Sequence, residues 1–404
     1  MAAALAPGER VSLVAGALVA LFSLSMLYHL AIIALGARAM ATMRSLSALR
    51  PPDPSRWPRL SLIIPACNEA DTLEAALRSR LESGYPNLEI ILIDDRSSDG
   101  TGALVDRLAS EDPRVRALHV TTLPEGWLGK LHAMQRGVEV CTGEWLLFTD
   151  ADVYVAPGAL ARSVAHAEQH ALDHLTVFPE LHGGSFLCDG AITSFTFSAG
   201  IAAPPWQIEN PRSPKAVGVG AFNLVRRAAL DRTPGLVWLK LEPIDDIALA
   251  QMLKRQGGAR ASIVSGRGTV RVEWYRTLRA MALGTEKGAY ALAGNYQATR
   301  HYLACALLAL SALLPLFALL PVAPTWLRLA ALVDLGLMTG YAVTLARWNG
   351  RRLAPALLWP LTSLLLIFLM ARAGWVAERR GGVTWRGTLY PLAELRAGRR
   401  ITLL

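Results

Sequence analysis

The sequence predicts an α/β domain with a mainly parallel sheet, flanked by membrane-spanning segments. Long apolar stretches lie towards both ends of the 404 residues, and hydrophobic residues make up 52% of the chain against 18% charged residues. Between the stretches, strand-like apolar runs alternate with helix-like segments. Acidic clusters follow two of these runs, and the carboxyl ends of parallel strands are where open α/β sheets bind ligands.

The first apolar stretch, residues 11–35, is long enough to cross a bilayer. A cleaved signal peptide is the alternative, but the stretch exceeds a signal core and lacks a basic start. Residues 38–59 are basic, with five arginines and one aspartate. The positive-inside rule therefore places the amino terminus outside and the following polar segment in the cytoplasm.

Three further stretches are long enough to span: about Tyr302–Leu320, Leu327–Ala346 and Ala354–Val376. The loop 347–352 and the tail 378–404 are basic, which predicts that both are cytoplasmic. One crossing before the polar segment and three after it would put the tail outside. We therefore expect one carboxyl-terminal stretch to be re-entrant or interfacial; the alternative is a tail that breaks the rule.

These patterns predict a multi-pass protein of the cell inner membrane. Its expected parts are an amino-terminal span (1–37), a cytoplasmic domain (38–300) with interfacial segments near 190–206 and 271–297, membrane helices (301–377) and a basic tail (378–404). The net charge of +9 suits an anionic membrane surface, and the placing of the arginines beside the membrane stretches disfavours nucleic acid as a partner. Four cysteines without metal or disulfide spacing indicate a reducing compartment.

Within the polar segment, expected strands alternate with expected helices. The strands are 60–65, 88–93, 115–120 and 145–149. The helices run from residues 68–71 to about 83, from about 97 onwards, and from 130 to 141. Such alternation predicts right-handed crossovers between parallel strands.

Three motifs carry a family resemblance: Ile63–Glu69, Ile93–Thr101 and Phe148–Asp152. They resemble, in order and spacing, the family 2 glycosyltransferases with the Rossmann-like GT-A fold. The likeness extends over roughly Leu60–Arg276. The tail motif Val383–Tyr390 and the membrane layout are similar to a narrower group that includes ceramide glucosyltransferases and bacterial hopanoid-associated and carotenoid-type glycosyltransferases.

Asp94 and Asp95 end an expected strand, so both can reach the ligand crevice. The alternative is a cap for the helix that begins near Ser97. The resemblance implies that the pair binds the nucleoside of a UDP-sugar. It also implies a set of donor-binding positions: Pro65, Asn68, Glu69, Asp94, Asp95, Lys130 and Asp150.

Asp150 and Asp152 lie on one side of an extended segment, an arrangement that can ligate Mg²⁺ or Mn²⁺ and leave room for diphosphate oxygens. An Asp-rich turn is the alternative. The resemblance makes Asp152 the principal metal ligand. Lys130 follows a Gly-Trp-Leu-Gly segment at an expected helix start, where anions are favoured, and it is one of only five lysines; a solvated lysine is the alternative.

The third acidic cluster is Asp245-Asp246, preceded by Glu242. The resemblance aligns Asp246 with the catalytic base that takes a proton from the acceptor hydroxyl, with Asp245 in place of the family's Glu. Adjacent carboxylates raise the pKa of one member, which suits a base. A helix amino-terminal acid pair is the alternative. Glu242 is a further candidate participant.

The family's Gln-x-x-Arg-Trp motif is eroded here to Val270–Trp274. Trp274 and Arg271 are candidate acceptor-site residues, and an interfacial anchor is the alternative for this segment. The erosion disfavours a polymer-extruding synthase. The resulting hypothesis is an inverting, metal-dependent enzyme that moves a sugar, glucose by resemblance, from UDP to the hydroxyl of a membrane lipid. Transfer to a polyprenyl phosphate and a non-catalytic nucleotide-sugar-binding scaffold are the rival hypotheses, and the oligomeric state is left open.

Overall fold

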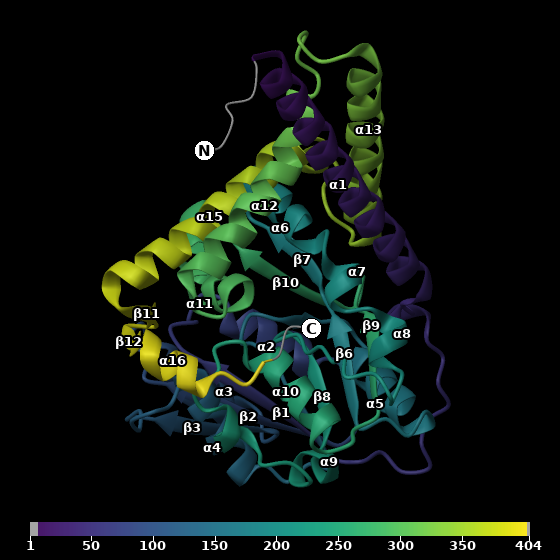
Figure 1. Cartoon of the computed structure of the whole chain (residues 1–404). Coiled ribbons are helices and arrows are strands. Elements are labelled where there is room, and N and C mark those ends of the chain that lie inside the picture. The colour runs from purple at the N-terminus through teal and green to yellow at the C-terminus, as the bar shows by residue number, and fades with distance from the viewer. Residues whose placement is uncertain (1–6, 402–404) are drawn as a thin grey trace.

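The computed structural model describes residues 7–401, except the side chains of residues 7–15 and 199. Its centre is a seven-stranded sheet in the order β3-β2-β1-β4-β8-β6-β9 (Figure 1). Strands β1, β2, β3 and β4 run parallel, as do β6 and β9. The strands are β1 Leu60–Ala66, β2 Leu88–Asp95, β3 Val115–Val120, β4 Trp145–Phe148, β6 His174–Phe178, β8 Asn223–Arg226 and β9 Ala261–Ser265.

This arrangement confirms the predicted α/β class and the mainly parallel sheet. The reversed strand β8 pairs antiparallel with both β4 and β6, which the local patterns did not indicate. A smaller sheet, in the order β5-β10-β7, joins Tyr154–Val155, Val270–Tyr275 and Glu180–Gly183. Strand β5 begins two residues after Asp152, so the smaller sheet borders the second acidic cluster, which is Asp150 and Asp152.

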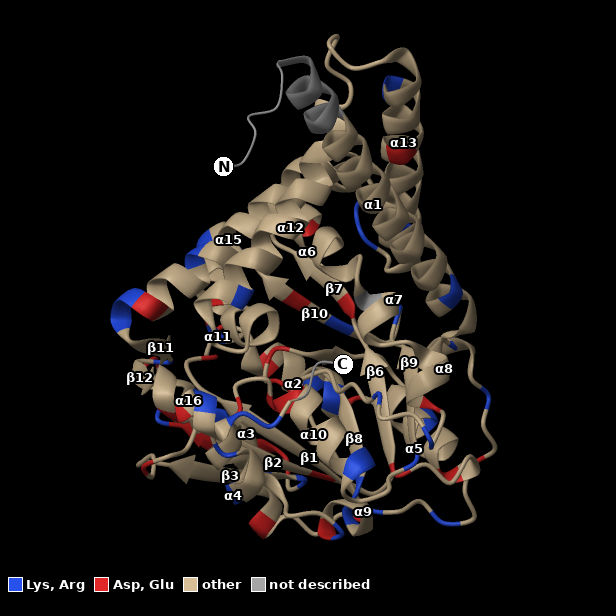
Figure 2. Cartoon of the chain, in the orientation of Figure 1, with Lys and Arg blue, Asp and Glu red and all other residues tan. Residues whose placement is uncertain are grey.

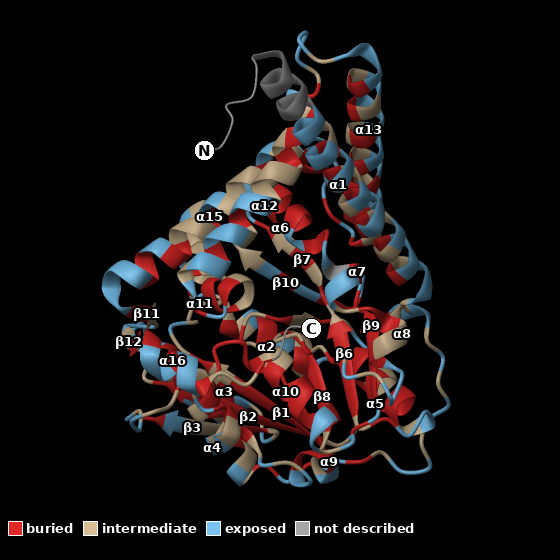
Figure 3. Ribbon diagram, viewed as in Figure 1, coloured by how far each residue is buried: buried red, intermediate tan, exposed pale blue. Residues whose placement is uncertain are grey.

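Helices cover both faces of the main sheet, and its strands are the most deeply buried part (Figure 3). Alternating side chains of β1 divide between two cores, with Leu62 facing one and Ile63 the other. The first core packs against α2 Leu73–Leu81, α3 Thr101–Glu111 and α5 Ala159–Gln169, and the second against α4 Gly129–Val140 and α10 Asp245–Arg255. The remaining short elements of the domain are η1 Leu46–Ala48, α7 Ala199–Ala202, α8 Pro205–Ile208, α9 Arg227–Asp231 and η2 Leu236–Leu239.

Helices α2 and α3 begin later than the sequence patterns predicted, because the motif loops use the intervening residues. Asn68 has a φ of 58°, and its Oδ1 accepts the backbone N–H of Ser98 at 2.8 Å. Asp99 accepts the N–H of Thr101, and the N-cap of α3 is Gly100, five residues beyond Asp95. The first and second motifs are thereby joined into one rigid rim.

In the part of the chain that the structure describes, four helices are long and apolar enough to cross a membrane. They are α1 Pro7–Thr42, α12 Ala298–Phe317, α13 Thr325–Trp348 and α15 Trp359–Arg380. Their charges gather mainly near their ends, and many of their outward side chains are exposed and apolar (Figures 2 and 3). Such surfaces suit contact with lipid.

Helix α15 returns to the sheet domain at both of its ends. Before it, the turn after α13 is tied to α6 (Phe186–Thr196), because Arg351 donates to Thr196 Oγ1 at 3.0 Å. The short α14 (Ala354–Leu357) leads to Trp359, whose Nε1 donates to Thr339 part-way along α13 at 3.1 Å. At its other end, α15 packs against α11 (Leu278–Gly294) beside the domain.

The tail folds back onto the domain as a hairpin and a short helix. Strands β11 (Gly382–Trp385) and β12 (Thr388–Pro391) are joined by a two-residue turn with positive φ at Arg386 (47°) and Gly387 (81°). Positive φ at both central residues is the geometry of a tight hairpin turn. Helix α16 (Leu392–Gly398) follows, and side chains between 383 and 401 complete the second core.

Candidate active site

The three acidic clusters meet at one edge of the main sheet. Asp94 and Asp95 end β2, and Asp150 follows β4, whose parallel course brings both ends to the same edge. Asp245 and Asp246 begin α10 on the adjoining side. The convergence follows from the topology: carboxyl ends of parallel strands flank a shared crevice.

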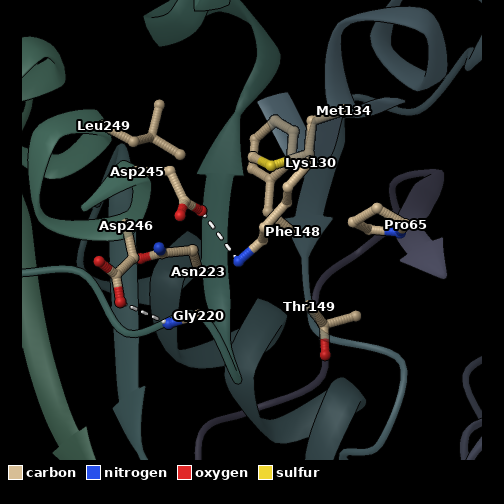
Figure 4. A pocket seen from close by; sticks show the side chains of 10 residues that line it. All are labelled: Pro65, Lys130, Met134, Phe148, Thr149, Gly220, Asn223, Asp245, Asp246 and Leu249. Atoms are coloured by element: carbon tan, nitrogen blue, oxygen red, sulfur yellow. Dashed lines mark hydrogen bonds and ion pairs between the residues drawn. The ribbon is translucent and has the colours of Figure 1, made fainter. Parts of the chain in front are cut away.

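Lys130 joins two of the clusters. Its Nζ lies 2.8 Å from Asp150 Oδ1 and 2.9 Å from Asp245 Oδ2, and the second contact is drawn in Figure 4. Burial acts to lower the pKa of Lys130, but the charges of Asp150 and Asp245 outweigh it and raise the pKa above its ordinary value. Lys130 therefore remains a cation enclosed by acids rather than a solvated side chain.

The neighbouring carboxylates of the third cluster have opposite pKa shifts. For Asp245, burial raises the pKa, but Lys130 and Lys287 outweigh it and lower the pKa to about 2. For Asp246, burial and the charge of Asp245 raise the pKa to about 6. Asp246 is therefore the member suited to accept a proton near neutral pH.

A glycine-rich loop, residues 217–223, packs between the second and third clusters. The N–H of Gly220 donates to Asp246 Oδ2 at 2.9 Å (Figure 4). A Cβ on Gly220 would lie 2.7 Å from Asp150 Oδ2, so glycine is required for this approach. The enclosed cavity is about 10 Å³, lined by Pro65, Lys130, Met134, Phe148, Thr149, Gly220, Asn223, Asp245, Asp246 and Leu249.

The second cluster, Asp150 and Asp152, carries negative charge that Lys130 and Arg80 offset only in part. Burial, together with the charges of Asp150 and Glu69, raises the pKa of Asp152 to about 7. A divalent cation would relieve this repulsion, so the residues fit a metal held with donor oxygens. Among residues 7–401, no group of three or more His, Cys, Asp and Glu side chains forms a metal site, so diphosphate and water would supply the remaining ligands.

Arg80 supports the metal loop from behind, a role that the sequence patterns did not indicate. It is fully buried, and its Nη2 donates to the carbonyl oxygen of Asp150. Burial lowers the pKa of its guanidinium to about 10, against the charges of Asp152 and Asp150. The cation thus fixes the loop and partly offsets its acids.

The first two motifs form the wall beside the clusters. Asp95 is buried and forms an ion pair with Arg96 at 2.8 Å. A Cβ on Gly129 would lie 2.5 Å from Oδ2 of Asp95, so the start of α4 packs closely against this carboxylate. Asp94 accepts the N–H of Ser97 at 3.3 Å, so it also closes the turn after β2. The predicted nucleoside pair is thus adjacent to the start of α4.

The tail hairpin also reaches this wall. Arg386 donates to the carbonyl oxygen of Cys67 and, through Nη2, to Glu69 at 3.1 Å. The tail motif Val383–Tyr390 has no place in the site that the sequence predicts. Only the fold shows that residues over 300 positions apart are neighbours.

Glu242, predicted as a catalytic participant, lies outside the cavity that Asp245 and Asp246 line. It is fully buried, and its carboxylate accepts the N–H groups of Ile244, Arg400 and Ile401. It does not line the cavity between the acids. Its contacts make it the anchor of the tail segment.

The candidate acceptor residues lie on β10. Trp274 packs against Phe195 of α6, with ring centroids 4.9 Å apart, and stacks on Tyr275. Arg271 lies over the ring of Tyr154 at 5.3 Å, which places it near the loop that carries Asp152. Both the predicted acceptor role and the predicted interfacial role are compatible with these contacts.

Comparison with known proteins gives a family match for part of the sheet domain. Residues 61–232 match the family model described as Glycosyl transferase family 2. Residues 61–232 of this chain are thus similar to the family 2 glycosyltransferases. The match supports the predicted transferase class and agrees with the family that the three motifs resemble.

Curated relatives match about a third of this chain or less. The succinoglycan biosynthesis protein ExoO of Rhizobium meliloti is 34% identical over 32% of this chain and 36% of its own length. The undecaprenyl-phosphate mannosyltransferase of Micrococcus luteus is 38% identical over 26% of this chain and 42% of its own length. A GalNAc(5)-diNAcBac-PP-undecaprenol beta-1,3-glucosyltransferase of Campylobacter jejuni is 32% identical over 28% of this chain and 35% of its own length. The chain thus covers well under half the length of these relatives.

A solved structure extends the likeness in fold. The mannosyltransferase PcManGT from Pyrobaculum calidifontis, in complex with GDP-Man and Mn²⁺, aligns with a TM-score of 0.54 and 21% identity. The alignment covers 86% of this chain and 97% of that one. The likeness in fold therefore extends over most of the chain.

Proposed function

We propose that this protein is an inverting, metal-dependent glycosyltransferase that transfers a sugar from a UDP-sugar to the hydroxyl of a membrane lipid. The observation that carries the proposal is the meeting of three acidic clusters at the carboxyl edge of the sheet, next to apolar helices. Nucleotide-sugar chemistry needs a nucleoside site, a charge-neutralising site for diphosphate and a base.

Each cluster has a distinct role in this proposal. Asp94 and Asp95 accept hydrogen bonds from the nucleoside, while Asp150 and Asp152 hold Mg²⁺ or Mn²⁺. When bound, the cation supplies Lewis-acid stabilisation of the departing diphosphate. Asp246 takes the proton from the acceptor hydroxyl as its oxygen displaces UDP from the anomeric carbon in a single step, which inverts that centre.

The apolar surroundings support a lipid as acceptor. Phe186, Leu187 and Phe195 of α6 are exposed, although soluble domains usually bury such side chains. Phe195 contacts Trp274, so the exposed apolar surface continues to the proposed acceptor residues. Ceramide, a hopanoid, a carotenoid acid and diacylglycerol fit this requirement for an apolar body with a polar end.

The membrane layout that we propose has three crossings and one re-entrant segment. Helices α1, α12 and α13 cross, whereas 349–380 enters from the domain side and returns to it, as the contacts of Arg351 and α11 support. This layout keeps both the basic loop and the basic tail on the cytoplasmic side of the inner membrane. It removes the conflict in the count of spans.

A polyprenyl phosphate is the second candidate acceptor. Two of the named relatives have undecaprenyl-linked substrates in their names. Arg276 lies just before α11 and Arg279 lies in its first turn, and both are exposed, so a phosphate could reach them. Mass spectrometry of membrane lipids from cells with and without the gene tests both. Loss of a neutral glycolipid supports the first candidate, loss of a glycosyl phospho-polyprenol supports the second, and an unchanged lipid profile contradicts both.

A further inference from the structure

Asp245 is held by two lysines, and only one of them belongs to the predicted motifs. Lys130 Nζ lies 2.9 Å from Oδ2, and Lys287 Nζ lies 3.2 Å from Oδ1. Lys130 is also 2.8 Å from Asp150, so its charge is shared between two clusters. Lys287 therefore provides the second cation at the acid pair.

Lys287 is fixed from two directions. Trp385 of the tail hairpin lies under its ammonium group, 4.9 Å from Nζ to the ring centroid. The preceding residue of α11, Glu286, is buried and pairs with Arg372 at 2.6 Å and Arg380 at 3.0 Å, both on α15. A buried carboxylate with two guanidinium partners holds this part of α11 against the membrane helix. The position of Lys287 thus depends on both α15 and the hairpin.

The charges that face the acid pair come from three elements. Lys130 of α4 and Lys287 of α11 both contact Asp245 directly. Asp150, in the loop after β4, contacts Lys130 and so acts on the pair indirectly. The glycine-rich loop adds a backbone N–H, and Asn223 at the cavity is neutral. With both lysines in place, Asp245 stays ionised, so Asp246 is the carboxyl group left to exchange a proton.

We propose that Lys287 is a positioning residue for the base. From the membrane-facing helix α11 it holds Asp245 beside Asp246, and Trp385 keeps Lys287 in place. This inference rests on the proposed function. It adds a residue that links the tail and the membrane helix to the proton-accepting group.

The test is the pH dependence of kcat/KM in the full-length protein in nanodiscs, with UDP-glucose as donor and a total membrane lipid extract as acceptor. Lys287→Met should move the acid limb of the profile to higher pH by about one unit, a loss of about fivefold at pH 6, because Lys130 alone then offsets the charge of Asp245 beside Asp246. Lys287→Arg should retain the wild-type profile. Trp385→Leu should shift the acid limb in the same direction but by a smaller amount than Lys287→Met does, because Lys287 stays present without its ring contact.

Arg212→Met, which removes one charge from an exposed loop, is the matched control and should leave the profile unchanged. A Lys287→Met profile that superimposes on the wild type would overturn the positioning role. So would a loss of equal size at every pH, since that result assigns Lys287 to folding alone. A wild-type protein without transfer to any lipid, with any of the common UDP-sugars, would refute the proposed function itself and this inference with it.

Discussion

The assignment of Asp246 as the base predicts a specific defect in Asp246→Asn. The amide is the same size and still accepts the Gly220 N–H, which is 2.9 Å away in the wild type, so the loop should stay in place. It cannot take the acceptor proton. A positioned general base contributes about 10² to 10⁴ in rate, so we expect kcat to fall by that factor.

The pH profile gives the sign of the effect. The pKa of Asp246 is raised to about 6, so the group is protonated and inactive below that value and ionised above it. At pH 7 about nine in ten molecules carry the ionised base, and kcat/KM should fall about tenfold per pH unit below 6. The asparagine variant should lack this acid limb.

The assay measures transfer from radiolabelled UDP-sugar into extracted lipid, beside equilibrium binding of UDP. Transfer should fall while the Kd for UDP changes by less than about threefold, because Asp246 is assigned no nucleotide contact. Asp246→Asn with wild-type turnover would refute the base assignment. Equal loss of transfer and UDP binding would instead make Asp246 a donor-site residue.

Further predictions concern the metal, its support and the tail. EDTA should stop turnover and Mn²⁺ or Mg²⁺ should restore it; activity that persists in EDTA contradicts metal dependence. Because the pKa of Asp152 is raised to about 7, protons compete with the cation, so the concentration of Mn²⁺ for half-activation should be several-fold higher at pH 6 than at pH 8. Arg80→Met should raise that concentration at pH 8 and lower the melting temperature, whereas equal Mn²⁺ dependence would show that the arginine only fills space. Glu242→Gln should lower stability by about 2 kcal/mol, measured by denaturant unfolding, because a buried carboxylate that binds three backbone N–H groups loses its charge; unchanged stability would contradict the anchoring role.

The parts of the site that the sequence predicted are those fixed by local rules. Asp95 and Asp150 follow apolar runs, and parallel strands must end on one edge, so their convergence could be inferred from the order of the runs alone. Asp245-Asp246 was recognisable from its residue types and its place in the order of motifs. Each of these inferences depends on neighbours within a few residues.

The parts that could not be predicted depend on contacts between distant segments. Lys287 is 42 residues from Asp245, and its pairing requires that α11 turn back over α10. Arg80 has the pattern of an ordinary surface arginine on an amphipathic helix, yet it is buried under the metal loop. Glu242 lies beside the third cluster in sequence, but its side chain points to tail amides instead.

The antiparallel direction of β8 is another feature that local sequence patterns could not predict. Its four residues resemble any short buried strand, and direction is set by the path of the chain through α6, α7 and α8. Periodicity reports which residues are buried and does not report strand direction. The sheet could thus be predicted as mainly parallel but not in its full order.

The tail hairpin has a consequence for how the protein is made. Val383, Tyr390, Leu395 and Ile401 fill part of the core that packs under the first strands. A ribosome releases these residues only after α12, α13 and α15 have been synthesised. The sheet domain therefore cannot complete this core until those three helices have been synthesised.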